Sequence, residues 1–400
     1  MTRRCTVARL TAATILMLAT ITAGAALPRG AAASERSLTA GAVLHTVTLN
    51  DAPCALAVDT RLGRIWVTTS AGNNVSVLDA SSGAILRTVR VGKDSYPCLL
   101  AVDETTGRVF VASKSSPRVS VLDARGATVL STVNVGASGA TVTAVAVDEP
   151  TGRVFVAASD DPDLGSVRVL DASSGVVLHT AKVGSDPTAL AIDEKTGRVF
   201  VTNAGDSSVS LLDARSGAVV STRTVGAIEQ AVAVDRTTGR VFVVRQDHEQ
   251  PATANGAVTM LDASSGAILR TVTVRVAPTV AAVDEQTGRV FVANSNGGSV
   301  SVLDARSGTV LRTVTVAQMN RTVDASDAAG LVAVDATTRH VFTANPGGDS
   351  VSLLDASSGA IVRTVAVGTM PDKVVVDERS ERAFVAYLDG ESVSVLDASG

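Results

Sequence analysis

The stretch TGRVFVAN, residues 287–294, is written in closely related form eight times along the chain. Each copy follows a phrase related to AVD and precedes one related to SVSVLDA. The aspartate that ends the first phrase recurs at Asp59, Asp103, Asp148, Asp193, Asp235, Asp284, Asp335 and Asp377. The first and last of these are 318 residues apart over seven steps, so the repeat is about 45 residues long, which is typical of propeller blades. Seven steps give eight units.

Each unit contains four short runs of apolar and β-branched residues, separated by Gly, Asp, Asn and Ser. One unit reads VAAVD, RVFVAN, SVSVLDA and TVLRTVTV, at residues 280–284, 289–294, 299–305 and 309–316. Runs of this length with alternating character predict strands, and no stretch has a useful helical period. Four antiparallel strands repeated radially predict an all-β fold, a single β-propeller of eight four-stranded blades.

The two ends of the repeat region complement one another. Residues 41–49, GAVLHTVTL, resemble a fourth strand without the three before it, and residues 392–400, SVSVLDASG, resemble a third strand without a fourth. We therefore expect the N-terminal strand to complete the last blade and close the ring, which removes exposed sheet edges. The alternative is seven blades with an extra unit.

The first 33 residues differ from the rest. Three arginines precede an apolar stretch at residues 10–27, and the small residues Ala31 to Ala33 follow. This order predicts a secretory signal peptide cleaved after Ala33, and the alternative is a retained membrane anchor. The predicted organisation is a signal peptide at 1–33, a linker at 34–40 and the propeller at 41–400. We expect no membrane span after cleavage and a location outside the cell or in its envelope.

The charge balance argues against nucleic acid as a partner. The chain has 35 basic and 39 acidic residues, a formal net charge of -4, and no polybasic run. A hydrophobic content of 46% predicts a large buried core.

The repeat resembles the YVTN β-propeller repeat family. The resemblance rests on FVTN at 200–203, FVAN at 291–294 and FTAN at 342–345, each set between an AVD phrase and an LDA phrase. It implies an exported or cell-surface propeller that usually has no known catalytic activity. Seven blades are the commoner number in that family, so eight is a departure. The family motif is structural and implies no active-site residues.

The repeated residues have structural explanations. The aspartates of VDEQTGR and LDASSG suit tight turns, because a short carboxylate accepts hydrogen bonds from nearby backbone N–H groups. Every Phe and the single Trp hold one position in the second strand of a unit and are predicted to be core residues. These residues are Trp66, Phe110, Phe155, Phe200, Phe242, Phe291, Phe342 and Phe384.

Candidate binding residues lie in the second-to-third and fourth-to-first loops, which vary in length and content. The three largest differences are at residues 159–166, 245–257 and 317–330. They supply the candidates Asp160, Asp161, Asp163, Asp247, His248, Glu249, Asp324 and Asp327. Cys54 and Cys98 occupy the same place in consecutive repeats and are predicted to form a disulfide; the alternative is two buried free thiols.

Nucleophile-elbow, phosphate-loop, zinc-protease and haem motifs are missing from the sequence. No cofactor is predicted. The favoured hypothesis is a non-enzymatic exported scaffold that binds an unknown envelope or extracellular partner through the variable loops. The alternative is a metal-dependent hydrolase or lyase, similar to lactonases, with a site at the mouth of the central channel. Its candidates are Asp186, Asp206, Glu229 and Asp372.

Overall fold

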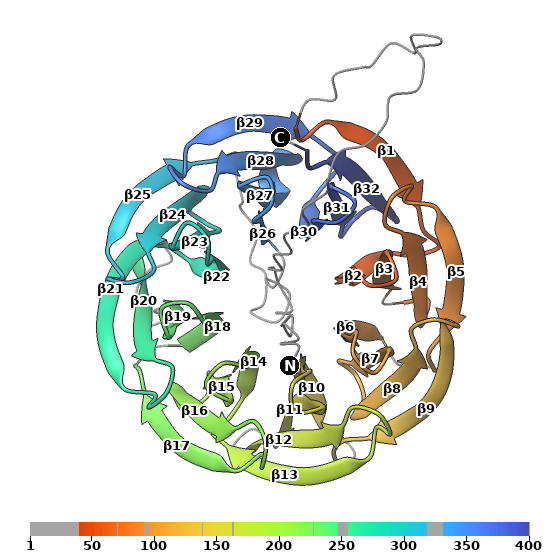
Figure 1. Ribbon diagram of the computed structural model, residues 1–400, viewed down its shortest axis with the longest axis vertical. Helices are drawn as coiled ribbons and strands as arrows, with labels where there is room; N and C mark the ends of the chain where they lie inside the picture. The colour runs from red at the N-terminus through yellow and green to blue at the C-terminus, as the bar shows by residue number, and fades with distance from the viewer. Residues whose placement is uncertain are drawn as a thin grey trace, which may run out of the picture.

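Eight four-stranded antiparallel sheets form a closed ring around a central axis in the computed structural model (Figure 1). The structure describes residues 40–69, 71–92, 96–137, 139–161, 164–226, 228–246, 255–317 and 331–399. In each sheet the strands follow chain order from the axis outward, with the outermost strand of the last blade supplied by the N-terminal end. The prediction of an eight-bladed all-β propeller is confirmed, and the alternative of seven blades with an extra unit is excluded.

From the axis outward, each blade has an inner, a second, a third and an outer strand. The inner strands are β2 (Pro53–Asp59), β6 (Pro97–Asp103), β10 (Thr141–Asp148), β14 (Pro187–Asp193), β18 (Ile228–Asp235), β22 (Pro278–Asp284), β26 (Val332–Asp335) and β30 (Pro371–Asp377). The second strands are β3 (Arg64–Thr69), β7 (Arg108–Ser113), β11 (Arg153–Asp161), β15 (Arg198–Asn203), β19 (Arg240–Gln246), β23 (Arg289–Asn294), β27 (His340–Asn345) and β31 (Arg382–Tyr387).

The third strands are β4 (Asn74–Asp79), β8 (Arg118–Asp123), β12 (Leu164–Asp171), β16 (Ser208–Asp213), β20 (Asn255–Asp262), β24 (Ser299–Asp304), β28 (Ser350–Asp355) and β32 (Ser392–Asp397). The outer strands are β5 (Ile85–Arg90), β9 (Thr128–Asn134), β13 (Val177–Val183), β17 (Val219–Thr224), β21 (Ile268–Val276), β25 (Val310–Thr315), β29 (Ile361–Ala366) and β1 (Val43–Thr48). A short 3-10 turn, η1 (Pro346–Gly348), follows β27.

The first and last strands of the propeller lie together in blade 8. Strand β1 is the outer strand of the sheet β1-β32-β31-β30 and pairs with β32, with Thr46 opposite Ser394. Their hydroxyl oxygens are 2.7 Å apart, and the Asp397 N–H donates to the Ala42 carbonyl at 2.9 Å. The N-terminal strand therefore closes the ring, as the complementary ends predict.

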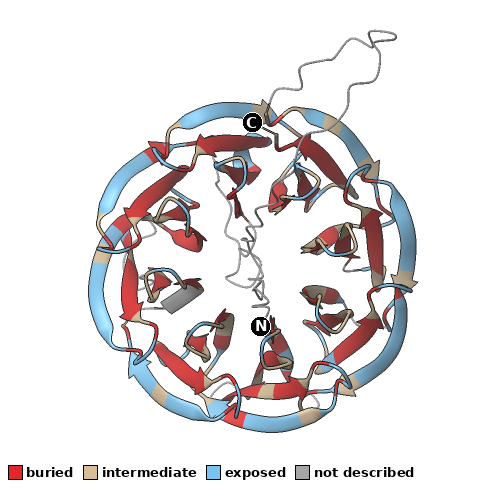
Figure 2. Ribbon diagram, viewed as in Figure 1, coloured by how far each residue is buried: buried red, intermediate tan, exposed pale blue. Residues whose placement is uncertain are grey.

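The core consists of apolar layers between neighbouring blades. All eight repeated aromatic side chains have 0% exposure. Trp66 of blade 1 packs with Val109 and Leu122 of blade 2, and Phe291 of blade 6 packs with Val341 of blade 7 in the same way. Figure 2 shows the buried residues on the three inner strands of each blade and the exposed residues on the outer strands. The aromatic position is therefore a packing position repeated around the ring.

A β-bulge near the start of the outer strand interrupts its exposed edge. In β5, Ile85 pairs with Leu78 and Arg87 with Val77, so Leu86 is the extra residue. The side chain of Leu86 is 52% exposed, and Val362 of β29 is 54% exposed at the same place. Because a bulge twists the strand and breaks its ladder, it makes the outer edge a poor template for pairing with another chain.

Candidate functional site

The turns between first and second strands and between third and fourth strands share one side of the ring, which we call the constant face. Their aspartates are turn residues. The Asp284 carboxylate accepts hydrogen bonds from the Gln286 N–H at 2.9 Å and the Thr287 hydroxyl at 2.6 Å. The next residue, Gly288, has a φ of 64°, which glycine adopts without strain. The repeated residues of this loop are therefore explained by the turn that they form.

The third-to-fourth turns use their aspartates similarly. The hydroxyls of Ser264 and Ser265 donate to one oxygen of Asp262, at 2.6 and 2.8 Å. These bonds favour the ionised carboxylate and lower the pKa of Asp262 to about 2. Its other oxygen lies 3.4 Å from Nη1 of Arg240, the arginine of the TGR phrase in the same blade. The aspartates of the constant face thus have local structural partners.

Four glutamates on the constant face join neighbouring blades, and we call them the inter-blade glutamates. Each follows the aspartate at the end of an inner strand and accepts a backbone N–H from the same loop of the preceding blade. The Glu104 carboxylate accepts the Arg61 N–H at 3.2 Å, and the Glu149 carboxylate accepts the Glu104 N–H at 2.8 Å. The Glu285 carboxylate accepts the Arg236 N–H at 3.0 Å, and the Glu378 carboxylate accepts the Ala336 N–H at 3.0 Å. Sequence reasoning missed this role, although a VDE or IDE triplet in five of the eight units carried the signal.

Glu194 holds the same position in blade 4 but is bonded differently. Its side chain is 6% exposed, and its nearest cation is the Arg236 guanidinium at 3.7 Å. That guanidinium also lies 3.0 Å from Glu285, so its charge is shared. Neither carboxylate oxygen of Glu194 has a hydrogen-bond partner among the residues that the structure describes. Burial raises the pKa of Glu194 to about 8, partly offset by Arg236, and the nearby Asp148 and Glu149 add to the rise.

Replacing Glu194 by glutamine is expected to remove a pH dependence of stability. Folding raises the pKa of Glu194 from 4.5 to about 8, so the folded chain binds more protons than the unfolded chain between these pH values. The wild-type free energy of unfolding should therefore fall as the pH rises from 4.5 to 8. At a pH of about 8.5 we expect Glu194→Gln to be more stable than the wild type by about 1–3 kcal/mol, and nearly equal to it at a pH of about 5.

Urea unfolding at the two pH values measures this difference. The matched control is Glu391→Gln, which removes an exposed carboxylate and should change neither value by more than about 0.5 kcal/mol. A Glu194→Gln chain that is less stable than the wild type at the higher pH would show that the charged carboxylate stabilises the fold.

The opposite side of the ring carries the second-to-third and fourth-to-first connections, and we call it the variable face. Part of the predicted loop at 159–166 is strand, because β11 continues to Asp161 and β12 starts at Leu164. Asp160 explains this extension: its carboxylate accepts hydrogen bonds from the Arg168 guanidinium at 2.8 Å and the Ser166 hydroxyl at 2.5 Å. The extra residues therefore lengthen a hairpin.

The remaining loop candidates lie mostly outside the described residues. The backbone of Asp161 is described, pairing with Leu164, but its side chain is not. The structure does not describe Asp163, Asp247, His248, Glu249, Asp324 or Asp327. The loop candidates therefore stay predictions.

Cys54 and Cys98 are joined by a disulfide, with their Cα atoms 5.0 Å apart. Each is an extra residue at a bulge near the start of an inner strand: Pro53 and Ala55 pair with successive residues of β3, and Pro97 and Leu99 with successive residues of β7. The disulfide therefore links the inner strands of blades 1 and 2 at the variable face.

The carboxylates of two acidic candidates of the enzyme hypothesis, Asp372 and Asp206, have local partners. Asp372 is buried and its carboxylate lies 2.8 Å from the Lys373 ammonium. Asp206 accepts the Ser208 hydroxyl at 2.6 Å and the Ser185 N–H at 3.3 Å, and the Asp186 carbonyl accepts the Ala204 N–H. The side chain of Glu229 is not described. Within the described ranges, no three His, Cys, Asp or Glu side chains are grouped so that they could hold a metal ion.

Comparison with known proteins supports a propeller. A family model described as lactonase, 7-bladed beta-propeller matches residues 211–374, and one described as outer membrane protein assembly factor BamB matches residues 71–248. Each match covers less than half of the chain. No curated protein matches it. Among the described residues there is no helix whose length and hydropathy would allow it to span a bilayer.

Two solved structures show the same architecture. BamB from Moraxella catarrhalis has a TM-score of 0.63 at 16% identity, with 89% of this chain and 99% of that chain covered. Kuenenia stuttgartiensis hydrazine synthase has a TM-score of 0.57 at 13% identity, with 92% of this chain and 99% of that chain covered. At these identities the likeness concerns the fold alone.

Proposed function

We propose that this chain is an exported, non-enzymatic propeller scaffold that binds a partner in the cell envelope through its variable face. The observation that carries the proposal is the contrast between the two faces. On the constant face, the described aspartates and the inter-blade glutamates are used in turns and blade contacts. On the variable face, the blades differ in strand length, loop length and polar residues, and such differences on a constant frame are where repeat proteins place binding.

The envelope location has three supports. Residues 1–33 have the order of a secretory signal peptide, and they lie outside the described residues. The match of residues 71–248 to an outer membrane protein assembly factor is consistent with a role in the envelope. The phrases FVTN, FVAN and FTAN also lead us to place the repeats with the exported YVTN propellers.

Site-specific cross-linking in cells that export the protein tests this function. In the test variant, residues 247–254 are replaced by the second-to-third connection at 204–207 of blade 4, and residues 318–328 are replaced by residues 369–370 of the fourth-to-first connection between blades 7 and 8. We expect recovery of the cross-linked partner to fall at least about tenfold, because the exchanged loops supply contacts that a binding surface needs.

The matched control changes the constant face instead. Arg125, Arg215 and Arg306 are exposed residues of third-to-fourth turns, and their triple replacement by alanine should leave recovery unchanged. Equal recovery with exchanged loops, or a loss confined to the arginine variant, would overturn the proposal.

A second candidate function is metal-dependent lactone hydrolysis, which the match of residues 211–374 to a lactonase model favours. The described residues do not assemble a ligand set for the metal. Hydrolysis of a simple lactone by the purified chain, lost with a chelator and restored by Mn²⁺ or Ca²⁺, would establish this function in place of the scaffold.

A further inference from the structure

The sixth residue of the second strand lies at the variable face, next to the end of the preceding blade. In blade 4, the Asn203 amide donates to the hydroxyls of Ser208 and Ser210, both at 3.0 Å. Asn294 and Asn345 make equivalent bonds in blades 6 and 7. The same asparagine–serine arrangement therefore recurs in three blades, and in blade 4 a Cβ atom added to Gly184, at the end of the preceding blade, would lie 2.7 Å from Asn203 Cβ.

Two other blades fill the space with larger side chains. In blade 5, the guanidinium of Arg245 donates to the carbonyls of Val225 and Gly226, at the end of the preceding blade. In blade 8, a Cβ atom added to Gly368 would lie 3.0 Å from Tyr387 Cζ, so the tyrosine ring lies against that backbone.

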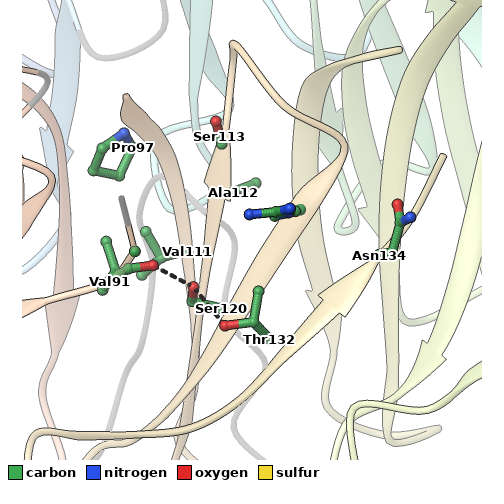
Figure 3. A pocket seen from close by; sticks show the side chains of 10 residues that line it. Val91, Pro97, Val111, Ala112, Ser113, Ser120, Thr132 and Asn134 are labelled. Atoms are coloured by element: carbon green, nitrogen blue, oxygen red, sulfur yellow. Dashed lines mark hydrogen bonds between the residues drawn. The ribbon is translucent and has the colours of Figure 1, made fainter. Parts of the chain in front are cut away.

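Blade 2 has neither the asparagine–serine arrangement nor a larger side chain at this position, and a pocket of about 400 Å³ lies there. Its residue at this position is Ser113, whose hydroxyl accepts the N–H groups of Ser115 and Ser116 within its own loop. The carbonyl of Val91 ends blade 1 as that of Val225 ends blade 4, but it accepts the Ser120 hydroxyl at 2.9 Å (Figure 3). Ser113 is smaller than the asparagine, arginine or tyrosine that stands at this position in blades 4 to 8, and this leaves room for the pocket.

The pocket has apolar walls and a cationic edge. Its apolar lining comes from Val91, Pro97, Val111 and Ala112. The cation is Arg118, which also lines the pocket and replaces the first serine of the asparagine–serine arrangement.

Arg118 is exposed and forms no ion pair with any described residue. It lies opposite Asn134, a second pocket residue, in the β8–β9 ladder, and residues directly opposite in a ladder project from the same face. A guanidinium that has no ion-pair partner within the described ranges and lies beside an amide and an apolar wall fits a carboxylate attached to a small aliphatic group.

We propose that the blade 2 pocket binds such a carboxylate, as presented by the C-terminal residue of a peptide with an aliphatic side chain. A free short-chain acid has the same chemistry. The pocket volume is within the range of small-ligand sites. The pocket lies on the variable face, so the biological partner in this inference is the one in the proposed function. The inference adds which chemical group of that partner the pocket would recognise.

Ligand-observed NMR and calorimetry with the mature chain test the pocket. The probes are N-acetyl-Val-Leu with a free carboxylate, the same dipeptide as its carboxamide, and isovalerate. We expect the acid dipeptide to bind at least about tenfold more tightly than the carboxamide, since a charge-assisted bond to an arginine is lost. Stronger binding of the dipeptide than of isovalerate identifies a peptide C-terminus as the source, and equal binding identifies a small acid.

Two variants and one control connect this binding to the pocket. Ser113→Asn with Arg118→Ser gives blade 2 the residues of blades 4, 6 and 7 and should abolish binding by filling the space. Arg118→Ala removes an exposed side chain without altering the core and should weaken acid binding at least about tenfold. Arg223→Ala, an exposed arginine on β17, should have no effect.

Three outcomes would overturn the inference: equal binding of acid and carboxamide, unchanged binding by both pocket variants, or no binding of either acid at about 20 mM, a concentration that reveals even weak affinity. The two proposals fail separately. If loop exchange abolishes partner recovery but the dipeptide does not bind, only the pocket proposal fails. If the dipeptide binds but loop exchange leaves partner recovery unchanged, only the proposal of a loop-mediated scaffold fails.

Discussion

Deletion of residues 34–49 from a chain that begins at residue 34 is expected to abolish the folded ring. Strand β1 supplies the outer edge of blade 8, and the side chains of Leu44, Val47 and Leu49 belong to the apolar layer between blades 8 and 1. Burial of Leu49 alone, which is 3% exposed, contributes about 1.5–3 kcal/mol. Together with the lost ladder, the change is comparable to the total stability of a typical domain, about 5–15 kcal/mol.

The measurement is thermal unfolding, together with the fraction of protein that remains monomeric. The matched control carries residues 41–49 after Gly400, where LDASG joins GAVLHTVTL and restores the third-to-fourth connection of the other blades. The two ends already meet in the structure, with the Gly41 N–H 2.7 Å from the Asp397 carbonyl, so this chain should fold. If the truncated chain keeps a cooperative transition at the wild-type temperature, β1 is not needed for closure.

Replacement of Phe200 by alanine should lower the free energy of unfolding by about 3–5 kcal/mol. Phe200 has 0% exposure and packs in one apolar layer with Val234 and Val241 of the next blade. Removing the ring takes apolar surface from the core and leaves a cavity that the paired strands on both sides cannot collapse to fill. Urea unfolding of the purified variant measures the loss.

Two further variants separate packing from other effects. Phe200→Leu keeps most of the volume and should cost less than about 1.5 kcal/mol. Tyr96→Ala removes a ring that is 50% exposed and should change stability by no more than about 0.5 kcal/mol. A loss below about 1 kcal/mol for Phe200→Ala would contradict the assignment of the repeated aromatic position to the core.

The fold was predictable because its determinants are local and repeated. The alternation within RVFVAN predicts a strand, and the aspartate and glycine around it predict a hairpin turn. Counting the repeats gives eight blades, and the unmatched strand at 41–49 indicates how the ring closes. These features depend on residues a few positions apart, or on the similarity of one repeat to the next, and both can be read along a single chain.

The candidate site was less predictable, because it depends on contacts between blades. The extension of β11 to Asp161 follows from the bonds of Asp160 to the facing strand, and strand length is decided by such cross-strand partners. Glu149 and Glu194 occupy equivalent positions about 45 residues apart, yet only Glu149 bonds to the preceding blade in the same way as the other inter-blade glutamates. The sequence shows their equivalence but not the neighbours that set their charge state.

By itself, the sequence determined the all-β architecture, the number of blades, the aromatic core position and the turn chemistry of the constant face. Only the tertiary structure decided which of the equivalent glutamates is buried without a hydrogen-bond partner among the described residues, which strands are lengthened, and which interface keeps a pocket. The physical reason is that turns and strands respond to neighbours along the chain, whereas burial, charge pairing and unfilled volume depend on the side chain that a different blade places opposite. At Ser113, the substitution is visible in FVAS, whereas the cavity beside it is lined by Val91 and Pro97, which the folded chain brings to this place.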